Sequence, residues 1–546
     1  MITIDTLRAD AISVYGSKTP TPFLQQFSER AVVFDKAFTA APITLPAHVS
    51  LFTGLYPPSH GVRHNGVYRA AETLNLLSEA AHSAGFETAA FVGAAPVAAV
   101  YGLNQGFDHY DDSFESTSTT TGIFAFAERS AEKVRLAAQN WLSNRNSSKP
   151  FFVWVHFFDP HHPYLTHGYS DLKPYAQEVA FTDHQLGEFF QFLEKQSARN
   201  DNLIVITSDH GEAFGEHKEI SHSLFVYNTT LRIPLMIEGP GIEAGRRNEL
   251  VRIIDIYPTI VELMKWKSPS KIDGISLLPL LRGEKFQSQE SYSESFAPAI
   301  DFGWSPLACF QDTKFKYIYA PKPELYKIDT DAGETKNLIG SGSEEKYKSK
   351  VLTLLARSNS ADSQHTPSAE ERERLRALGY VAGTPQKIQW NAADPKDRVD
   401  VANKIAELSM KQMRTTERQQ AYAAIAKLDP SNPLLLLRYG EILLQNKDYA
   451  TAEKVFEQVI TIGYPSAAPY NGLAASLYYQ ERSEDAERVL QQAVDRGLAD
   501  GETYFNLAEF LYNRGEIHQA FTYYDNSTQL GYKLAAPRKA QLERSQ

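Results

Sequence analysis

The segment LIVITSDHGE, residues 203–212, joins a short apolar run to a group of polar residues. A short apolar run bounded by polar residues is typical of a strand that is buried inside a sheet. Asp209 and His210 then stand directly after that strand. Ligands of open α/β sheets bind beyond the carboxyl ends of the strands, so this pair is a candidate for binding or chemistry.

The same pattern recurs through the first half of the chain. Amphipathic stretches with helical periodicity, such as residues 71–85 and 176–196, separate the β-rich runs. This alternation predicts an α/β fold with a doubly wound, mainly parallel sheet that is covered on both faces. Besides residues 203–208, the runs that we expect to be buried parallel strands are ITID (2–5), AVVF (31–34), TAAFVG (88–93), FFVWVHFF (151–158) and PLMIEG (234–239).

The pattern changes beyond residue 290, where short alternating strands are expected at 314–321 and 324–329. They predict a small antiparallel subdomain over 290–340, at the end of a catalytic domain that spans residues 1–340. Residues 341–397 are rich in Ser, Glu, Lys and Gln, which predicts a linker with one short helix at 369–380.

The remainder of the chain contains a repeat of 34 residues. Small residues coincide when the sequence is aligned with itself at this shift, and small residues are expected where paired helices touch. The pattern resembles the tetratricopeptide repeat family, which implies an all-α solenoid over residues 398–546 with a degenerate first unit and a capping tail. The two coinciding sets are Gly440, Ala474 and Ala508, and Ala452, Ala486 and Ala520.

Composition excludes several classes of protein. A chain of 546 residues exceeds what one core supports, so two or more domains are expected. The net charge of -11 is spread along the sequence and no strongly basic segment stands out, so we expect no nucleic acid partner. No apolar run approaches the ~20 residues needed to span a bilayer. Cys309 is the single cysteine, which excludes an internal disulfide and a four-cysteine metal cluster.

The first expected strand, ITID, is short for a strand that opens a domain. It is therefore compatible with a stretch of chain that precedes Met1 and could carry an export signal. The compartment stays open: extracytoplasmic or periplasmic if such a signal exists, and cytoplasmic otherwise.

Asp5, at the end of the first expected strand, joins Asp209 and His210 as a candidate metal ligand. Carboxylate and imidazole groups together favour Zn²⁺ or Mn²⁺, whereas Ca²⁺ and Mg²⁺ prefer oxygen throughout. The alternative is structural: Asp209 caps a helix and His210 lies on a solvated loop.

Eight segments, in order, resemble the sulfatase-like branch of the alkaline phosphatase superfamily. This resemblance covers residues 2 to about 340 and implies that Asp5, Asp209 and His210 bind a metal beside the nucleophile. The segments are ITIDTLRAD (2–10), TLPAHVSLFTGLYPPSHGVRHNG (44–66), HFFDPHHPY (156–164), EVAFTDHQLG (178–187), TSDHGEAFGEH (207–217), LRIPLMIEGPG (231–241), DIYPTIVEL (255–263) and ELYKIDTDAGETKNL (324–338).

The expected nucleophile departs from the sulfatase pattern. Typical sulfatases carry Cys-x-Pro-Ser-Arg or Ser-x-Pro-Ser-Arg, whose first residue becomes formylglycine, whereas this chain has Thr44-Leu45-Pro46-Ala47-His48. The Thr-x-Pro-x-His pattern instead resembles nucleotide pyrophosphatases and phosphodiesterases, which implies that Thr44 attacks phosphorus and also contacts the metal. Pro46 suits the first turn of a helix, whose N-terminus would stabilise the transferring group. The alternative is that Thr44 is only a helix N-cap.

Other side chains follow from the same resemblance. Asn65 matches a residue that contacts the substrate, and Arg63 is a candidate to replace the arginine that is absent at position 48. His48 either contacts the ester or packs within its helix.

The segment HFFDPHHPY contributes three more candidates, Asp159, His161 and His162. His161 matches a residue that contacts the substrate ester. Asp159 and His162, with His222, are the candidates for a second metal site, and His222 is alternatively a general acid. His217 and Asp183 are expected to be structural.

These residues predict a metal-dependent hydrolase or transferase that cleaves a phosphodiester or phosphomonoester through a covalent Thr44 intermediate. The alternatives are a sulfatase and an inactive scaffold that acts through its repeats. We expect one or two divalent ions, with Zn²⁺ or Mn²⁺ ahead of Ca²⁺ or Mg²⁺. The substrate is a small-molecule, glycan, lipid or nucleotide ester, and the repeats are expected to bind a protein or another copy of the chain.

Overall fold

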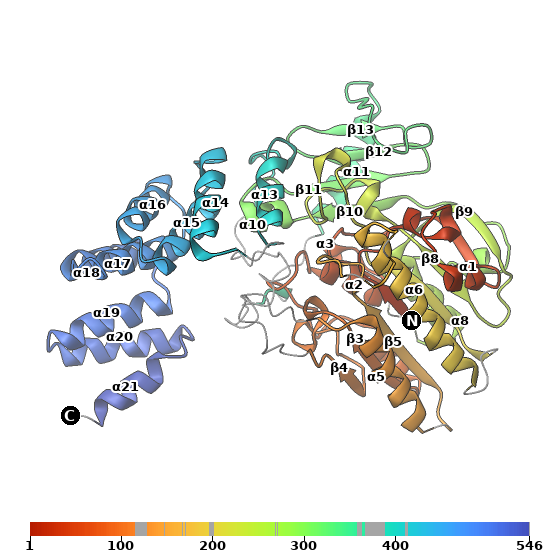
Figure 1. Ribbon diagram of the computed structural model, residues 1–546, viewed down its shortest axis with the longest axis horizontal. Coiled ribbons are helices and arrows are strands. Elements are labelled where there is room, and N and C mark those ends of the chain that lie inside the picture. Colours follow the sequence, from red (N-terminus) through yellow and green to blue (C-terminus); the bar gives the residue numbers. More distant parts are fainter. Residues whose placement is uncertain are drawn as a thin grey trace. The chain divides into compact units, whose positions relative to one another are not determined.

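The computed structural model describes residues 1–114, 128–146, 148–165, 167–169, 171–195, 201–267, 269, 271–357, 363–365, 388–409 and 413–544. The chain divides into two compact units, Met1–Gln412 and Met413–Gln546. The first unit contains two sheets and the second contains helices only (Figure 1).

The main sheet of the first unit has nine strands, in the order β4-β3-β5-β1-β6-β8-β2-β7, with β9 paired to β2. β1 lies near its centre and pairs in parallel with both β5 and β6. The strands are β1 (Ile2–Ile4), β2 (Val32–Phe38), β3 (Glu87–Val92), β4 (His109–Asp111), β5 (Phe151–Phe157), β6 (Ile204–Ser208), β7 (Arg232–Ile233), β8 (Leu235–Glu238) and β9 (Gly245–Arg252).

One strand runs against the prediction. β8, predicted from PLMIEG as a parallel strand, pairs antiparallel with both β6 and β2. Residues 209–234 connect β6 to β8. They contain a 3-10 turn, the short helix α7 (Asn228–Leu231) and the two-residue strand β7, and the chain then returns beside β6 in the opposite direction. A parallel neighbour would have required a crossover, usually through a helix long enough to cover the sheet. The sheet is otherwise mainly parallel, as predicted.

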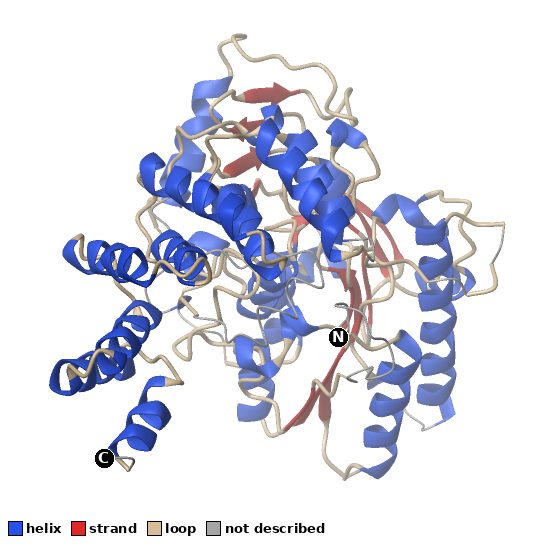
Figure 2. Ribbon diagram, turned by 60° about the vertical axis from the view of Figure 1, so that its left-hand side comes forward, coloured by secondary structure: helices blue, strands red, loops and turns tan. Residues whose placement is uncertain are grey.

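Helices cover both faces of the main sheet, which confirms the doubly wound architecture (Figure 2). α1, α5 and α6 pack together over one face, and α2, α4 and α8 pack over the other. The helices of the first unit are α1 (Pro22–Ser28), α2 (Thr44–Thr53), α3 (Pro57–His60), α4 (Leu77–Ser83), α5 (Ala131–Asn144), α6 (Pro174–Lys195), α7, α8 (Ile256–Leu263), α9 (Leu278–Leu281), α10 (Ala297–Phe302), α11 (Glu344–Leu355) and α13 (Val399–Ser409). Short 3-10 turns occur at Ala9–Ala11, Ser13–Tyr15, Ala95–Val97, Ala99–Tyr101, Glu216–Lys218, Ile253–Asp255 and Pro395–Asp397.

The small antiparallel sheet is present as predicted, in the order β10-β11-β12-β13. Its strands are β10 (Ser291–Ser295), β11 (Leu307–Gln311), β12 (Lys316–Tyr319) and β13 (Glu324–Tyr326). α11 packs on β11 and β12, so the first part of the predicted linker belongs to this subdomain. Trp390 also contacts Phe296 and Tyr319 from the far end of that segment. The helix predicted at 369–380 lies outside the described residues.

The second unit consists of antiparallel helix pairs. Gly440 and Gly472 lie so close to Phe456 that a Cβ at either position would come within 2.6 Å or 2.4 Å of its ring. Gly440, one of the small residues that coincide at the 34-residue shift, is therefore needed for this close approach of its helix to Phe456. The helices are α14 (Thr415–Leu428), α15 (Pro433–Gln445), α16 (Tyr449–Ile462), α17 (Ala468–Tyr478), α18 (Ser483–Asp495), α19 (Gly501–Asn513), α20 (Ile517–Gln529) and α21 (Ala535–Glu543).

The boundary between the units falls later than residue 398, where the repeats were expected to begin. α13 belongs to the first unit, and the side-chain amide of Asn403 donates a hydrogen bond to the Lys218 carbonyl at 2.6 Å. No helix among the described ranges is long and apolar enough to cross a membrane.

The boundary leads to a prediction about truncation. Removing residues 413–546 should leave turnover of a small substrate and the thermal unfolding midpoint of the first unit nearly unchanged. A truncation after residue 397 also removes α13 and its bond to Lys218, and we expect it to lower the midpoint. Differential scanning calorimetry of both truncations and the full chain checks this. Loss of folding in the chain 1–412 would show that the units depend on each other.

Candidate active site

The predicted metal ligands come together at the carboxyl edge of the main sheet. Asp5 follows β1 and Asp209 follows β6, and the parallel pairing of β1 and β6 aligns the ends of the two strands. Asp5, Asp209 and His210 are fully buried, and each offers a ligand atom within 4.8 Å of the others. The His210 Nε2 atom lies 3.4 Å from Asp209 Oδ2 and 3.9 Å from Asp5 Oδ1.

The two oxygens of the Asp209 carboxylate differ in their hydrogen bonding. Its Oδ1 atom accepts hydrogen bonds from the backbone amides of Thr6, at 3.2 Å, and His210, at 2.8 Å. Its Oδ2 atom, both carboxylate oxygens of Asp5 and His210 Nε2 have no hydrogen-bond partner among the described residues. Backbone amides therefore hold Asp209 in an orientation that directs its second oxygen toward the cluster.

These buried polar atoms fit a divalent cation. Unpaired buried carboxylates are costly. Burial raises the pKa of Asp5 to about 7, and burial together with the charge of Asp5 raises the pKa of Asp209. A cation held by Asp5, Asp209 and His210 would remove this cost. The mixed oxygen and nitrogen donor set is consistent with Zn²⁺ or Mn²⁺.

Thr44 is the first residue of α2, and the N-cap position is occupied by Ile43. The N-cap alternative for Thr44 is therefore wrong. The Thr44 side chain is fully buried and interacts with Asp5. This interaction favours the charged carboxylate, and so it offsets part of the rise in the Asp5 pKa that burial causes. Thr44 thus combines a position at a helix N-terminus with direct proximity to the candidate metal ligands, and we predict that it also contacts the cation.

Asn65 supplies the cap that α2 otherwise lacks. Its Oδ1 atom accepts a hydrogen bond from the Leu45 backbone amide at 2.8 Å, which orients the side-chain amide. Asn65 is fully buried, and its Nδ2 group has no hydrogen-bond partner among the described residues. One side chain therefore holds the N-terminus of the Thr44 helix and presents an unused N–H donor.

We predict that Asn65→Asp separates these two roles. Asp retains the oxygen that caps α2, so the unfolding midpoint should stay near that of the wild type at a pH low enough to protonate the carboxyl, whereas the buried charge should lower it at neutral pH. It loses the Nδ2 donor, so kcat should fall by about 10²- to 10³-fold, as for removal of one donor from an anion-binding site. Asn65→Ala removes both roles and should lower the midpoint as well. Equal kcat for wild type and Asn65→Asp would contradict a substrate contact.

His48 is buried and bound at both ring nitrogens. Nδ1 lies 2.8 Å from the Thr44 carbonyl oxygen, and Nε2 lies 3.1 Å from Thr3 Oγ1. Thr3 Oγ1 also accepts a hydrogen bond from Trp154 Nε1, so its own proton is available to His48 Nε2. His48 then donates from Nδ1 to the Thr44 carbonyl, which gives it a part in fixing the start of α2, and the same Nδ1 lies 3.6 Å from Asp209 Oδ2.

The Arg63 guanidinium is already engaged by side chains of the protein, so it is not available to bind an anion. Its Nη1 atom donates to Glu294 Oε2 at 3.0 Å, and its guanidinium lies over the Phe296 ring. The neighbouring His64, which the sequence did not single out, places Nε2 3.0 Å from Asp301 Oδ2. The carboxylate of Asp301 helps raise the pKa of His64 against the effect of burial.

His161 and His222 lie together on the side of the cluster next to His210. The ring centroid of His222 is 4.5 Å from that of His210 and 5.1 Å from that of His161. His161 Nδ1 lies 2.5 Å from the His162 carbonyl oxygen, whereas its buried Nε2 has no partner among the described residues. His222 Nδ1 is 3.0 Å from Glu212 Oε1. Both rings are therefore oriented by their Nδ1 atoms.

The predicted second metal site is not formed by the described residues. Asp159, His162 and His222 do not converge, because Asp159 instead groups with His167 and Glu178. The Asp159 Oδ2 atom accepts a hydrogen bond from the Ala131 amide at 2.7 Å. The turn after β5 thus places Asp159 with His167 and Glu178, a grouping that the sequence HFFDPHHPY does not encode.

The two residues expected to be structural have structural contacts. Asp183 accepts hydrogen bonds from the backbone amides of Phe23 and Leu24 at the start of α1. His217 stacks on Tyr227 with ring centroids 3.5 Å apart.

His156, within β5, is a residue that sequence reasoning missed. It is fully buried, and its Nε2 atom lies 3.4 Å from Asp5 Oδ2. The available signal was an imidazole in an otherwise apolar strand whose alternate residues, Phe152 and Trp154, face the core beneath α2. Strand alternation predicts the face but not the proximity to Asp5.

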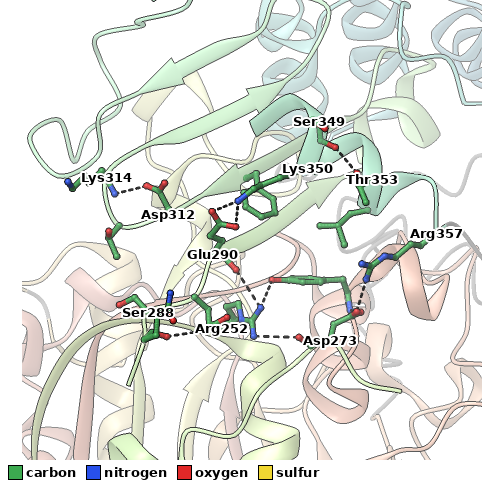
Figure 3. A pocket seen from close by; sticks show the side chains of 16 residues that line it. Arg252, Asp273, Ser288, Glu290, Asp312, Lys314, Ser349, Lys350, Thr353 and Arg357 are labelled. Atoms are coloured by element: carbon green, nitrogen blue, oxygen red, sulfur yellow. Dashed lines mark hydrogen bonds and ion pairs between the residues drawn. The ribbon is translucent and has the colours of Figure 1, made fainter. Parts of the chain in front are cut away.

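A polar cleft of about 800 Å³ lies elsewhere on the first unit, between the main sheet, the small sheet and α11 (Figure 3). Its lining includes none of the predicted site residues. Three of its cationic side chains are paired with acidic ones: Arg252 binds Asp255, Arg357 binds Asp273 and Lys350 binds Glu290. The last two pairs connect α11 and its end to other segments of the first unit, so the volume of this cleft does not indicate the site of chemistry.

Comparisons with known families agree with this architecture. The sulfatase family matches residues 1–266, and the C-terminal region of N-sulphoglucosamine sulphohydrolase matches residues 215–361. The tetratricopeptide repeat family matches residues 415–468 and 471–529.

Individual relatives are distant in sequence, but the match extends over most of the length of each relative. An uncharacterized sulfatase, YidJ, of Escherichia coli (strain K12) is 24% identical over 61% of this chain and 81% of its own. A choline-sulfatase of Rhizobium meliloti (strain 1021) is 25% identical over 58% and 77%. The structure of a phosphonate monoester hydrolase of Agrobacterium radiobacter shares the fold, with a TM-score of 0.54, 20% identity and coverage of 65% and 95%.

The families, the sheet order and the cluster at the carboxyl ends of β1 and β6 agree with one another. The chain thus contains a sulfatase family domain with the alkaline phosphatase-like fold, joined to C-terminal tetratricopeptide repeats.

Proposed function

We propose that the first unit is a cation-dependent hydrolase or transferase that cleaves phosphate esters through a covalent Thr44 intermediate. The observation that carries this proposal is the set of unpaired buried atoms on Asp5, Asp209 and His210 beside the Thr44 hydroxyl. A bound divalent cation would lower the pKa of that hydroxyl and offset the charge of the ester.

The identity of the nucleophile favours phosphate over sulfate. A formylglycine hydrate has a second hydroxyl that can expel sulfate from the covalent intermediate, whereas threonine has only one. Thr44 cannot be converted to formylglycine, and the single cysteine, Cys309, is buried in β11. Release from Thr44 therefore requires attack by water, which suits a phosphoryl group.

The reaction consists of two displacements. The Thr44 oxygen forms a bond to phosphorus while the bond from phosphorus to the leaving oxygen breaks, and the Thr44 proton passes to water. The departing oxygen takes up a proton, for which the protonated form of His222, held at Nδ1 by Glu212, is our candidate donor. Burial lowers the pKa of His222 to about 4, so the ring must take up this proton again before each turnover. Water then attacks the phospho-threonine, which restores the Thr44 hydroxyl and releases the phosphate product. In a transferase, an acceptor alcohol replaces this water.

Two groups would bind the phosphoryl oxygens. Asn65 Nδ2 and the N-terminus of α2 are donors that suit the equatorial oxygens of an in-line transition state. His161 Nε2 is a further buried polar atom on the His222 side, where we place the ester oxygen.

The charges beside Asn65 favour a singly charged substrate group. Arg63 is paired with Glu294, and His64 is paired with Asp301, so the charge of each cation is already offset. We predict that kcat/KM for an aryl phosphodiester exceeds that for the matching phosphomonoester, a dianion, by about 10-fold or more, because excess buried charge is costly. A preference for the monoester would contradict this assignment.

The decisive test compares nitrophenyl esters with metal-stripped protein after addition of Zn²⁺, Mn²⁺, Ca²⁺ or Mg²⁺. The substrates are the phosphodiester, the phosphonate monoester, the phosphomonoester and the sulfate. Cleavage of the sulfate alone would establish the sulfatase alternative and refute the phosphate proposal. Absence of turnover with every metal and substrate would favour an inactive scaffold.

The repeats are typical of protein interaction, and we propose that they bind a protein segment or another copy of the chain. Tyr478 and Tyr479, at the end of α17, are 52% and 60% exposed and supply aromatic contact area. Sedimentation of the full chain and of the chain 1–412 distinguishes self-association from binding of a separate partner.

A further inference from the structure

His156 is an imidazole whose position the proposed reaction does not yet explain. It lies in the apolar strand β5, is fully buried, and follows Trp154 on the face that packs beneath α2. A buried polar ring in such a strand requires hydrogen-bond partners, because an unsatisfied polar group in a core is costly.

One ring nitrogen of His156 is bound by the backbone. The Gly93 amide donates a hydrogen bond to His156 Nδ1 at 3.3 Å. A Cβ at position 93 would lie 3.0 Å from the His156 carbonyl oxygen and 3.1 Å from Phe158 Cβ, so glycine permits this close approach. Because Nδ1 accepts a hydrogen bond, the proton of the neutral ring lies on Nε2.

The other ring nitrogen faces the candidate metal site. His156 Nε2 lies 3.4 Å from Asp5 Oδ2, and neither atom has a hydrogen-bond partner among the described residues, so the two atoms are close without a formed hydrogen bond. Of the two Asp5 oxygens, Oδ1 is the one nearer to His210 Nε2, at 3.9 Å. The two oxygens of Asp5 therefore face different groups, an N–H donor and the metal-binding cluster.

The remaining neighbours of His156 do not compete for Asp5. The His48 ring lies edge-on, 5.0 Å away between centroids, and both of its nitrogens are already bound. The Trp154 indole N–H donates to Thr3. His156 Nε2 is thus left 3.4 Å from Asp5 Oδ2 without a formed hydrogen bond, and the Asp209 carboxylate also acts on this ring.

We propose that His156 is a positioning residue for the cation site: its Nε2–H binds Asp5 Oδ2 and so keeps Asp5 Oδ1 directed at the ion. This inference rests on the proposed metal site. His156 does not act as a ligand itself, because a protonated ring nitrogen has no lone pair to coordinate a metal. Hydrogen-bonded partners of metal ligands typically contribute about 10- to 100-fold to metal affinity.

Two substitutions of similar size separate the ring nitrogens. His156→Gln places an amide N–H near the original Nε2 position, and His156→Asn places its amide near Nδ1 and leaves Asp5 without the donor. Metal-stripped protein is titrated with Mn²⁺ in a calorimeter. The affinity of the Gln variant for Mn²⁺ should lie within about threefold of that of the wild type. The Asn variant should bind about 10- to 100-fold more weakly.

Other results would overturn the proposal. Equal affinities for wild type and His156→Asn would show that the ring is only a packing element. If His156 were a ligand, both variants would lose affinity and their Zn²⁺ to Mn²⁺ preference would shift toward Mn²⁺, since imidazole favours Zn²⁺ more than an amide oxygen does.

A measurement on the wild type keeps the test independent of variant folding. Nitrogen-15 chemical shifts of the metal-free protein should show the Nε2–H tautomer for His156, and an Nδ1–H tautomer would refute the proposed donor. If the wild type binds neither Mn²⁺ nor Zn²⁺, the proposed function fails, and the proposal for His156 falls with the site that it positions. Normal wild-type binding with an unaffected Asn variant refutes only the role of His156.

Discussion

Thr44→Ala should reduce turnover of the preferred ester by about 10⁴- to 10⁶-fold, the range seen when a covalent nucleophile is removed. The physical reason is that the substitution deletes the only hydroxyl at the start of α2 beside Asp5. The fold should persist, because alanine is tolerated in a helix and the Asn65 bond to the Leu45 amide does not involve the Thr44 side chain.

Thr44→Ser is the matched control for this prediction. It keeps a hydroxyl at the same place, so it should retain activity within about 100-fold of the wild type and still form a covalent intermediate. Rapid-quench experiments with a substrate labelled at phosphorus, followed by mass spectrometry, should find the added phosphoryl group on residue 44 in the wild type and the Ser variant. Near-normal turnover by Thr44→Ala would refute covalent catalysis by Thr44.

Asp5→Asn should have opposite effects on metal binding and on the stability of the metal-free protein. Loss of a charged ligand should weaken cation binding by about 100-fold or more, beyond the effect typical of an outer partner of the site. In the absence of metal, however, the wild type must keep two like charges buried. The neutral amide removes one of them, so the metal-free variant should be more stable than the metal-free wild type.

The direction of the pH dependence follows from the raised pKa of Asp5, about 7 in the fold against an ordinary value of 3.8. Between these values the folded state binds more protons than the unfolded state, so the stability of the metal-free wild type falls as pH rises from about 4 to 7. A shift of about three units corresponds to roughly 4 kcal/mol, which is the upper range of the gain expected for Asp5→Asn at pH 8. At pH 4 the gain should be small.

Urea unfolding of metal-stripped wild type and Asp5→Asn at pH 4, 6 and 8 measures this effect. Asp183→Asn is a matched control, because Asp183 is also a buried carboxylate but accepts hydrogen bonds from Phe23 and Leu24. This control should leave cation affinity unchanged. Burial also raises the pKa of Asp183, to about 6, but an asparagine at this position can accept only one of the two backbone hydrogen bonds, so the gain in stability at pH 8 should be smaller for Asp183→Asn than for Asp5→Asn. A metal-free Asp5→Asn variant less stable than the wild type at pH 8 would contradict the unpaired carboxylate cluster.

The site was predictable from the sequence where its residues follow buried strands directly. Asp5, Asp209 and His210 could be placed at one edge of the sheet because parallel strands end at the same edge. Asn65 and Thr44 required a resemblance to known motifs. The bond between Asn65 and Leu45 spans 20 residues, and that between His64 and Asp301 spans 237, so neither distance is encoded in a local pattern.

The sequence by itself determined the alternation of strands and helices, the small antiparallel sheet and the 34-residue helical repeat. These features depend on local periodicity and on small residues at fixed spacing, which a single chain displays directly. The tertiary structure alone decided that β8 runs antiparallel, that Asp159 lies apart from His222, and that His156 faces Asp5. The physical reason is that an apolar strand has the same pattern in either direction, and that contacts between distant segments depend on how the sheet assembles.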